Sequence, residues 1–171
     1  MFGFIKDFVG CKKITDFLLT GNIDPDEEVI EFLPDFTFFT IQFDEKYLTF
    51  ESIEQYSKIR ISEENNLLFH DVKDEDFKKS YVSLINFLVI NGEYSNEHID
   101  TIILFNSNSS QGKIVCDAVK IVLSNGQVFF LEPFNFWGFN MGGETVEKNW
   151  IDNLRAVKDE RILDCKLTII K

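Results

Sequence analysis

The sequence contains few of the residues on which metalloenzymes and disulfide-stabilised proteins depend. Its 171 residues include only two histidines, three prolines and three cysteines. Cys11, Cys116 and Cys165 are odd in number and far apart, which favours reduced thiols in the cytoplasm over a disulfide framework. No second His or Cys lies at ligand spacing from His70 or His98, so we expect no metal site.

Long apolar runs and an excess of basic charge are also missing. No apolar run approaches the ~20 residues that span a bilayer, and the first seven residues carry charges where a secretory leader would have its apolar centre. We therefore predict a cytoplasmic protein that does not bind membranes. The chain has 17 basic and 29 acidic residues and no basic stripe, so repulsion by phosphates argues against nucleic acid as a partner.

No catalytic or cofactor motif stands out. The segment Ser109–Lys113 has a superficial likeness to a phosphate loop, but it lacks the first Gly at the required spacing and the Ser or Thr after the Lys. Catalysis by a Cys and a His would need distant residues to meet in space, which the sequence neither supports nor excludes. We expect a protein that is not an enzyme and that binds no cofactor.

The composition is that of one globular domain. Nineteen phenylalanines, 44% apolar residues and 27% charged residues provide the material for a hydrophobic core in a chain of this length. We predict a single α+β domain over residues 1–171, in which two or three helices pack on an antiparallel sheet.

Alternation of apolar and polar residues predicts most of the sheet. The Asn125–Gly126 pair predicts a hairpin that joins strands at 113–123 and 127–132 through a type I′ turn. Further strand patterns lie at residues 36–43, 47–53, 99–105 and 161–170, with another hairpin at 59–69.

Helical spacing of apolar residues predicts three helices. The strongest pattern predicts a helix over residues 74–90. Weaker patterns predict a helix over 10–20, which Gly21 would end as a left-handed cap, and one that contains Trp150 and Leu154. Residues expected in the core are Phe77, Tyr81, Leu84, Leu88, Val119, Ile121, Leu163 and Leu167.

The charge is distributed unevenly along the chain. Residues 1–23 contain two acidic and three basic residues, residues 24–100 contain nineteen and six, and residues 101–171 contain eight of each. The net charge of −12 therefore belongs to the acidic block between Asp24 and Asp100, which indicates an acidic surface and a basic partner. A solvated face without a partner is the other interpretation. The carboxylates expected to bind the partner are Asp24, Asp26, Glu27, Glu28, Glu31, Asp44, Glu45, Glu63 and Glu64.

The segment 133–143 has the most unusual local composition. Its aromatic residues are separated by Asn and Gly and follow neither a strand nor a helix period. If exposed, the side chains of Phe134, Phe136, Trp137 and Phe139 would offer anchors to a protein or a sugar ring. If buried, they would hold the loop to the core. This aromatic loop is the alternative binding site.

With its acidic block and its aromatic loop, the chain resembles the immunity proteins of bacterial toxin systems, including those of contact-dependent growth inhibition. The resemblance is compositional and is carried by residues 24–100 and 134–143. It implies tight binding of a cognate toxin domain, often a basic nuclease, by charge complementarity and by plugging of the toxin's active site. The alternatives are a small-molecule or carbohydrate-binding module that uses the aromatic loop, and an enzyme whose site is assembled from distant residues.

Overall fold

The computed structural model describes residues 3–10, 12–24, 30–55, 57–70, 77–88, 97–110, 112–135 and 138–171, with the backbone alone for residues 134 and 135. The elements in this part of the chain are α1 (Gly3–Lys6), β1 (Asp16–Asp24), β2 (Glu31–Phe43), β3 (Lys46–Ile53), β4 (Lys58–Glu64), β5 (Lys78–Ser83), α2 (Ile85–Leu88), β6 (Ile99–Phe105), β7 (Asn108–Ser110), β8 (Lys113–Cys116), β9 (Ala118–Leu123), β10 (Val128–Asn135), β11 (Gly138–Gly142), α3 (Glu144–Ala156), α4 (Glu160–Leu163) and β12 (Leu167–Ile170).

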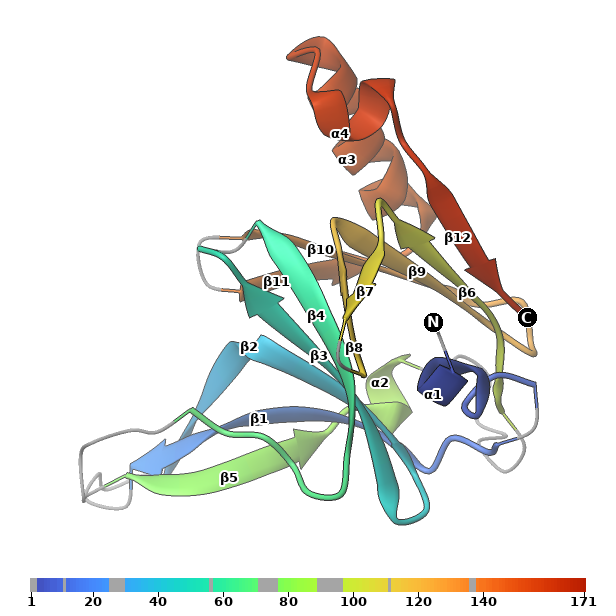
Figure 1. Cartoon of the computed structure of the whole chain (residues 1–171). Helices are drawn as coiled ribbons and strands as arrows, with labels where there is room; N and C mark the ends of the chain where they lie inside the picture. Colours follow the sequence, from blue (N-terminus) through green and yellow to red (C-terminus); the bar gives the residue numbers. More distant parts are fainter. Residues whose placement is uncertain are drawn as a thin grey trace.

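The strands form two antiparallel sheets (Figure 1). Sheet 1 has seven strands in the order β5-β1-β2-β3-β4-β8-β7, and sheet 2 has five in the order β11-β10-β9-β6-β12. The predicted antiparallel pairing is confirmed. The expectation of two or three helices packed on a single sheet is wrong, because α3 is the only described helix longer than four residues. None of the described helices is long and apolar enough to cross a membrane.

The main core lies between the two sheets. In β2, Phe39, Ile41 and Phe43 belong to this core, while Thr40 is on the other face and its hydroxyl lies 3.2 Å from that of Thr49. This alternation is what a pleated strand with one apolar face requires. The N-terminal segment adds to the same core, where the Phe8 and Phe43 rings lie 5.0 Å apart.

A second, smaller core lies on the other face of sheet 2, where α3 packs. Trp150 of α3 contacts the rings of Phe105 and Phe130 at centroid distances of 5.3 and 5.5 Å, and Leu154 is buried beside it. The prediction of a helix around these two α3 residues is confirmed. Figure 1 shows α3 and α4 on the side of sheet 2 that is away from sheet 1.

The chain passes from sheet 1 to sheet 2 at Asp117. The stretch 113–123, predicted as one strand, is divided there into β8, which pairs with β4, and β9, which pairs with β6 and β10. Both strands are rich in apolar residues, so the spacing of apolar residues along the sequence does not reveal that the stretch is divided at Asp117.

The predicted hairpin at Asn125–Gly126 is confirmed and joins β9 to β10. Its turn differs from the predicted type I′ turn, because only Gly126 has a positive φ, of 84°. The Asn125 side chain instead accepts a hydrogen bond from the backbone N–H of Gln127 at 2.8 Å. A single left-handed glycine after a type I turn is a common longer hairpin connection.

The predicted helix over residues 10–20 is wrong. Residues 16–20 belong to β1, which lies between β2 and β5 and is hydrogen-bonded to both. Phe17 and Leu18 are consecutive and both buried, so the side chains on both faces of this strand are shielded from water, whereas a narrow helical stripe would bury only one face. Gly21 is no helix cap: a Cβ there would lie 2.3 Å from the Leu33 carbonyl oxygen, so glycine allows the close approach of β2.

The predicted helix over residues 74–90 is also wrong within its described part. Residues 78–83 form β5 at the edge of sheet 1, and only Ile85–Leu88 is helical. The apolar residues of this segment have helical spacing, but the segment forms a strand because hydrogen bonding and packing against β1 contribute more than the local sequence preference. Residues 74–76 and 89–90 lie outside the described residues.

Two strand predictions hold only in part. Strand β4 is present, but residues 67–70 are not a strand, so the hairpin predicted at 59–69 is wrong; β4 pairs instead with β3 and β8. In the stretch 161–170, residues 160–163 form α4, which Asp159 caps, and the strand begins only at Leu167. The strands predicted at 36–43, 47–53 and 99–105 are confirmed within β2, β3 and β6.

Of the residues predicted to lie in the core, those in the β9–β10 hairpin are buried, but those in the edge strands β5 and β12 and in α4 are exposed. Val119 and Ile121 are fully buried, and Leu84 and Leu88 are partly buried against the main core. Tyr81 is 57% exposed. Leu163 and Leu167 are also exposed, as is Ile169, so the edge strand β12 has apolar side chains in contact with water.

Candidate functional site

The first group of predicted partner-binding carboxylates lies at one end of sheet 1. Asp24, the last residue of β1, is paired with Glu31, the first residue of β2. We call this the strand-end acidic group. Glu31 is exposed and Asp24 is half-buried. Asp26, Glu27 and Glu28, which connect the two strands in the sequence, lie outside the described residues.

The second group lies around the turn between β2 and β3. Asp44 and Glu45 are exposed in this turn, and Glu63 and Glu64 of β4 are in register with Leu48 and Tyr47 of β3. We call these four residues the turn-end acidic group. Glu63 forms an ion pair with Lys46, and Glu64 accepts a hydrogen bond from the Ser62 hydroxyl at 2.7 Å.

The two acidic groups lie at opposite ends of β2. This strand has 13 residues, and a rise of about 3.3 Å per residue makes it roughly 40 Å long. A partner domain of ordinary size would contact one group more closely than the other, so the structure divides the predicted surface into two candidate patches.

The aromatic loop is described only in part. Phe139 is 7% exposed and belongs to the main core, which agrees with the interpretation of a loop held by its own rings. The other predicted anchors of this alternative site, Phe134, Phe136 and Trp137, have side chains outside the described part of the structure.

A cavity of about 400 Å³ lies next to Phe139. Its walls come from β1 and β2 of sheet 1, from β11 of sheet 2, and from the segment that contains α2. Eight apolar side chains line it, among them Leu19, Phe36, Leu84 and Met141, and the single polar lining residue is Asn140. Volume and lining are those of pockets that bind small molecules.

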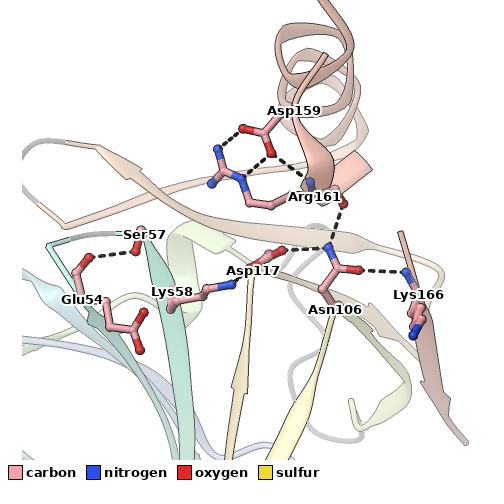
Figure 2. Close-up of polar contacts among 8 residues, drawn as sticks. All are labelled: Glu54, Ser57, Lys58, Asn106, Asp117, Asp159, Arg161 and Lys166. Atoms are coloured by element: carbon pink, nitrogen blue, oxygen red, sulfur yellow. Dashed lines mark hydrogen bonds and ion pairs between the residues drawn. The ribbon is translucent and has the colours of Figure 1, made fainter. Parts of the chain in front are cut away.

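A polar network surrounds the point where the chain changes sheets (Figure 2). The Asp117 carboxylate is 1% exposed; it forms an ion pair with Lys58 of β4 and accepts a hydrogen bond from the Asn106 amide at 2.7 Å. The same amide donates to the Arg161 carbonyl oxygen at 2.7 Å, and its own carbonyl accepts from the backbone N–H of Lys166 at 2.8 Å. The network therefore joins β4, β6, β9, α4 and β12.

A bidentate ion pair completes this network at α4. The Arg161 guanidinium donates to both carboxylate oxygens of Asp159 at 2.9 and 2.8 Å, and Asp159 also accepts from the Arg161 backbone N–H (Figure 2). These bonds lower the pKa of Asp159 to about 2. The four charged side chains of the network form two ion pairs, Lys58 with Asp117 and Arg161 with Asp159, so the network fits a structural joint better than a reactive centre.

Glu132 of β10 is a second buried carboxylate. It is 6% exposed, and its cross-strand partner Asn140 donates an amide hydrogen bond to it at 2.6 Å. Burial raises the pKa of Glu132, while the hydrogen bond from Asn140 opposes that rise. Glu132 and Asn140 alternate with Leu131 and Phe139 of the main core, so this hydrogen-bonded pair lies on the other face of sheet 2, where α3 packs.

We expect the Glu132→Gln variant to gain stability relative to the wild type as pH rises from 4 to 7. A carboxyl whose pKa is raised by folding keeps its proton in the folded state after the unfolded state has lost it, so its contribution to stability falls as pH rises through the folded pKa. Glutamine does not titrate, so it removes this pH-dependent contribution to stability, and its side-chain oxygen can still accept the hydrogen bond from Asn140. Melting temperatures at pH 4, 5.5 and 7, with the exposed Glu160→Gln as control, measure the effect; a Glu132→Gln difference that stays constant contradicts it.

The described thiols do not have the surroundings of nucleophiles. Cys116 and Cys165 are both free. Burial raises the pKa of each, and the charge of Asp117 adds to the rise, so both remain protonated at neutral pH. Cys11 lies outside the described residues. Among the residues with described positions, no three His, Cys, Asp or Glu side chains gather as metal ligands would.

Sequence reasoning missed the two buried carboxylates and the cavity. Asp117 and Glu132 each stand alone among apolar residues of a strand pattern, and such an isolated acid in a core strand is the signal that could have found them. The cavity leaves no comparable signal, because its walls come from residues as distant in sequence as Leu19, Leu84 and Met141. No protein-family model, curated protein or solved structure matches this chain.

Proposed function

We propose that this chain is an immunity-type inhibitor: it binds a basic toxin domain through the strand-end acidic group and has no catalytic activity of its own. The support comes from the placement of charge. Of the nineteen acidic residues in the acidic block, seven belong to the two sequence segments 25–29 and 71–76, against one basic residue, Lys73.

The residues on both sides of segment 25–29 and those that follow segment 71–76 lie at the same end of sheet 1, and this observation carries the proposal. Segment 25–29 follows Asp24, which is paired with Glu31. Before segment 71–76, the His70 imidazole lies 3.7 Å from the Asp35 carboxylate; after it, Lys78 is paired with Ile23. Each of the two acidic segments therefore has a described neighbour in sequence at the end of the sheet that carries the strand-end acidic group, which supports the proposal.

Such a concentration of carboxylates has a physical consequence for association. A localised negative potential attracts a basic partner over a Debye length of about 8 Å at physiological ionic strength and raises the association rate. Inhibition of a toxin also needs slow dissociation, which close contacts formed after the encounter supply.

The turn-end acidic group is the weaker of the two patches. Lys46 neutralises Glu63 there, and no comparably acidic connection flanks this turn. The alternative of a carbohydrate or small-molecule module built on the aromatic loop receives no support from the described loop residue, since the Phe139 ring is buried.

Reversal of four charges at the strand end, in the variant Asp26→Lys, Glu27→Lys, Glu28→Lys and Glu31→Lys, is expected to slow association with the toxin about tenfold or more. It should also flatten the salt dependence of the rate, because electrostatic steering contributes roughly 10- to 1,000-fold to association. Surface plasmon resonance against the toxin domain encoded beside this gene, at 50 to 300 mM salt, measures both.

The matched control reverses four exposed carboxylates on the α3 and α4 side of the molecule, namely Glu144, Asp152, Glu160 and Asp164. It changes the net charge equally and should leave the rate much less affected. Equal effects of the two variants would show that only net charge matters. An unchanged rate and salt slope for the strand-end variant would contradict the proposed surface, and a neighbouring gene product that does not bind would contradict the function.

A further inference from the structure

Three of the four sheet edges have features that discourage pairing with another molecule. At the edges of sheet 1, β7 consists of polar residues only, and β5 begins with two lysines. Strand β11, at one edge of sheet 2, lies against β2 and α3. Strand β12, at the fourth edge, contains no charged residue and no proline, and among the described strands only β6 pairs with it. Lysine, proline and cover by another element are the usual protections of an edge, so β12 is the unprotected one.

Two large apolar side chains are exposed on β12. Leu167 is 55% and Ile169 is 56% exposed. They lie on the same face of the sheet, because strand residues alternate, and Ile170 between them and Lys171 points into the main core instead. Figure 1 shows β12 at the outer side of sheet 2, far from the ends of β1 and β5. A strand that paired with β12 would therefore remove both side chains from water.

The outward backbone groups of β12 belong to the same two residues. The Lys166 carbonyl oxygen accepts a hydrogen bond from the Asn106 backbone N–H at 2.8 Å, so the backbone of Lys166 faces β6. In an antiparallel pair, residues that exchange hydrogen bonds with the neighbouring strand alternate with residues that do not. Leu167 and Ile169 lie one and three residues after Lys166, so their N–H and C=O groups point away from β6. Each of them offers a donor, an acceptor and an apolar side chain to another strand.

We propose that the chain forms a two-fold symmetric dimer in which the β12 strands of two copies pair antiparallel and join both copies of sheet 2 into one continuous sheet. A register centred on Thr168 places Leu167 of each copy opposite Ile169 of the other. Both exposed side chains and their outward backbone groups then have partners, and such cross-strand apolar pairs stabilise a sheet. A shift by two residues would instead place Leu167 opposite Lys171, or Ile169 opposite Cys165, which lies outside the strand.

The distribution of charge selects a second copy as the occupant of this edge. Residues 101–171, which include β12, contain eight acidic and eight basic residues, so two copies can approach through this part without local repulsion. The strands β1 to β5 of sheet 1 belong largely to the acidic block, and contact through them would bring two negative surfaces together. The dimer leaves the strand-end acidic group uncovered, so the proposal does not depend on binding of a toxin.

Sedimentation equilibrium of the wild type over a concentration series should show a monomer–dimer equilibrium. A salt concentration of about 0.15 M limits the Debye length to about 8 Å and screens the repulsion between the two acidic blocks. The contact between two short strands is small, so we expect a weak dimer.

The Ile169→Lys variant should raise the dissociation constant of the dimer about tenfold or more, because pairing would bury an ammonium group. The matched control is Tyr81→Lys, which makes the same change of net charge at a residue of the edge strand β5 that is 57% exposed, and it should dimerise like the wild type. Circular dichroism establishes that Ile169→Lys is folded; if it is not, Leu167→Lys replaces it. The proposal is overturned if the wild type is monomeric throughout the series, or if the lysine variant of β12 dimerises as the wild type does.

Disulfide cross-linking tests the register. In a Cys11→Ser, Cys165→Ser background, which retains the fully buried Cys116, Thr168→Cys places one thiol of each copy at the two-fold axis. The Cα atoms of such a non-hydrogen-bonded antiparallel pair lie about 4.5 Å apart, within the range that a disulfide spans. Oxidised glutathione should convert this variant to a covalent dimer on a non-reducing gel, and the exposed Ser110→Cys of β7 should remain mostly monomeric. Equal cross-linking of both variants contradicts the proposed register.

Discussion

Replacement of Asp117 by alanine is expected to lower the free energy of unfolding by about 3 kcal/mol, since removal of one partner from a buried ion pair typically costs 3 to 5 kcal/mol. The lower figure applies because the Lys58 side chain is 32% exposed and regains some hydration. The variant also removes the acceptor of the Asn106 amide, which is part of the joint between the sheets.

Urea denaturation of Asp117→Ala measures this loss. Asp117→Asn should cost less, because an amide oxygen can still accept from Asn106. The matched control is Asp152→Ala, which breaks the exposed ion pair with Lys148, 2.6 Å long, and should leave the midpoint nearly unchanged. If Asp117→Ala shifts the midpoint no more than Asp152→Ala, the network does not hold the two sheets together.

Replacement of Trp150 by alanine is expected to cost about 3 to 5 kcal/mol, the usual result for truncation of a large buried aromatic residue. Trp150 is 3% exposed and is the largest side chain that α3 contributes to the smaller core. Its edge-on contact with Phe105 and its tilted contact with Phe130 are both lost in the variant.

The measurement is again the denaturation midpoint, with far-ultraviolet circular dichroism to follow α3. Trp150→Phe retains a ring and should lose less. Val157→Ala, at a 73% exposed position just after α3, should change little. Loss of helical signal with an unchanged midpoint for sheet unfolding would show instead that α3 contributes nothing to the stability of sheet 2.

The predictable part of the fold consists of strands whose own residues alternate. Phe39, Ile41 and Phe43 mark β2 because that strand presents one apolar face to the core. In β1, by contrast, Phe17 and Leu18 are both buried, so apolar and polar residues do not alternate. The apolar residues of this region also happen to have helical spacing, which led to the wrong prediction of a helix over residues 10–20. Strand β5 lies at the edge of sheet 1, and its Tyr81 is exposed, so its sequence has no alternating apolar face. Its extended conformation depends on hydrogen bonds to β1, which the local sequence does not reveal.

The candidate site divides in the same way. The acidic block is a property of composition, so the sequence alone indicates it. Which carboxylates share a surface depends on pairing: Asp24 meets Glu31 across two strands, whereas Asp44 lies at the far end of β2. The cavity requires residues of β1, β2 and β11 to be brought together, and no local pattern encodes a space between two sheets.

The large negative charge of the chain also affects how the exposed edge strand β12 behaves in solution. As an edge strand, β12 presents unpaired backbone groups beside Leu167 and Ile169, which is the arrangement that promotes strand pairing between molecules. Mutual repulsion of chains that each carry −12 opposes such pairing at neutral pH. Near the isoelectric point of about 4.6 the repulsion vanishes, so colloidal stability should be lowest there, with self-association starting at this strand.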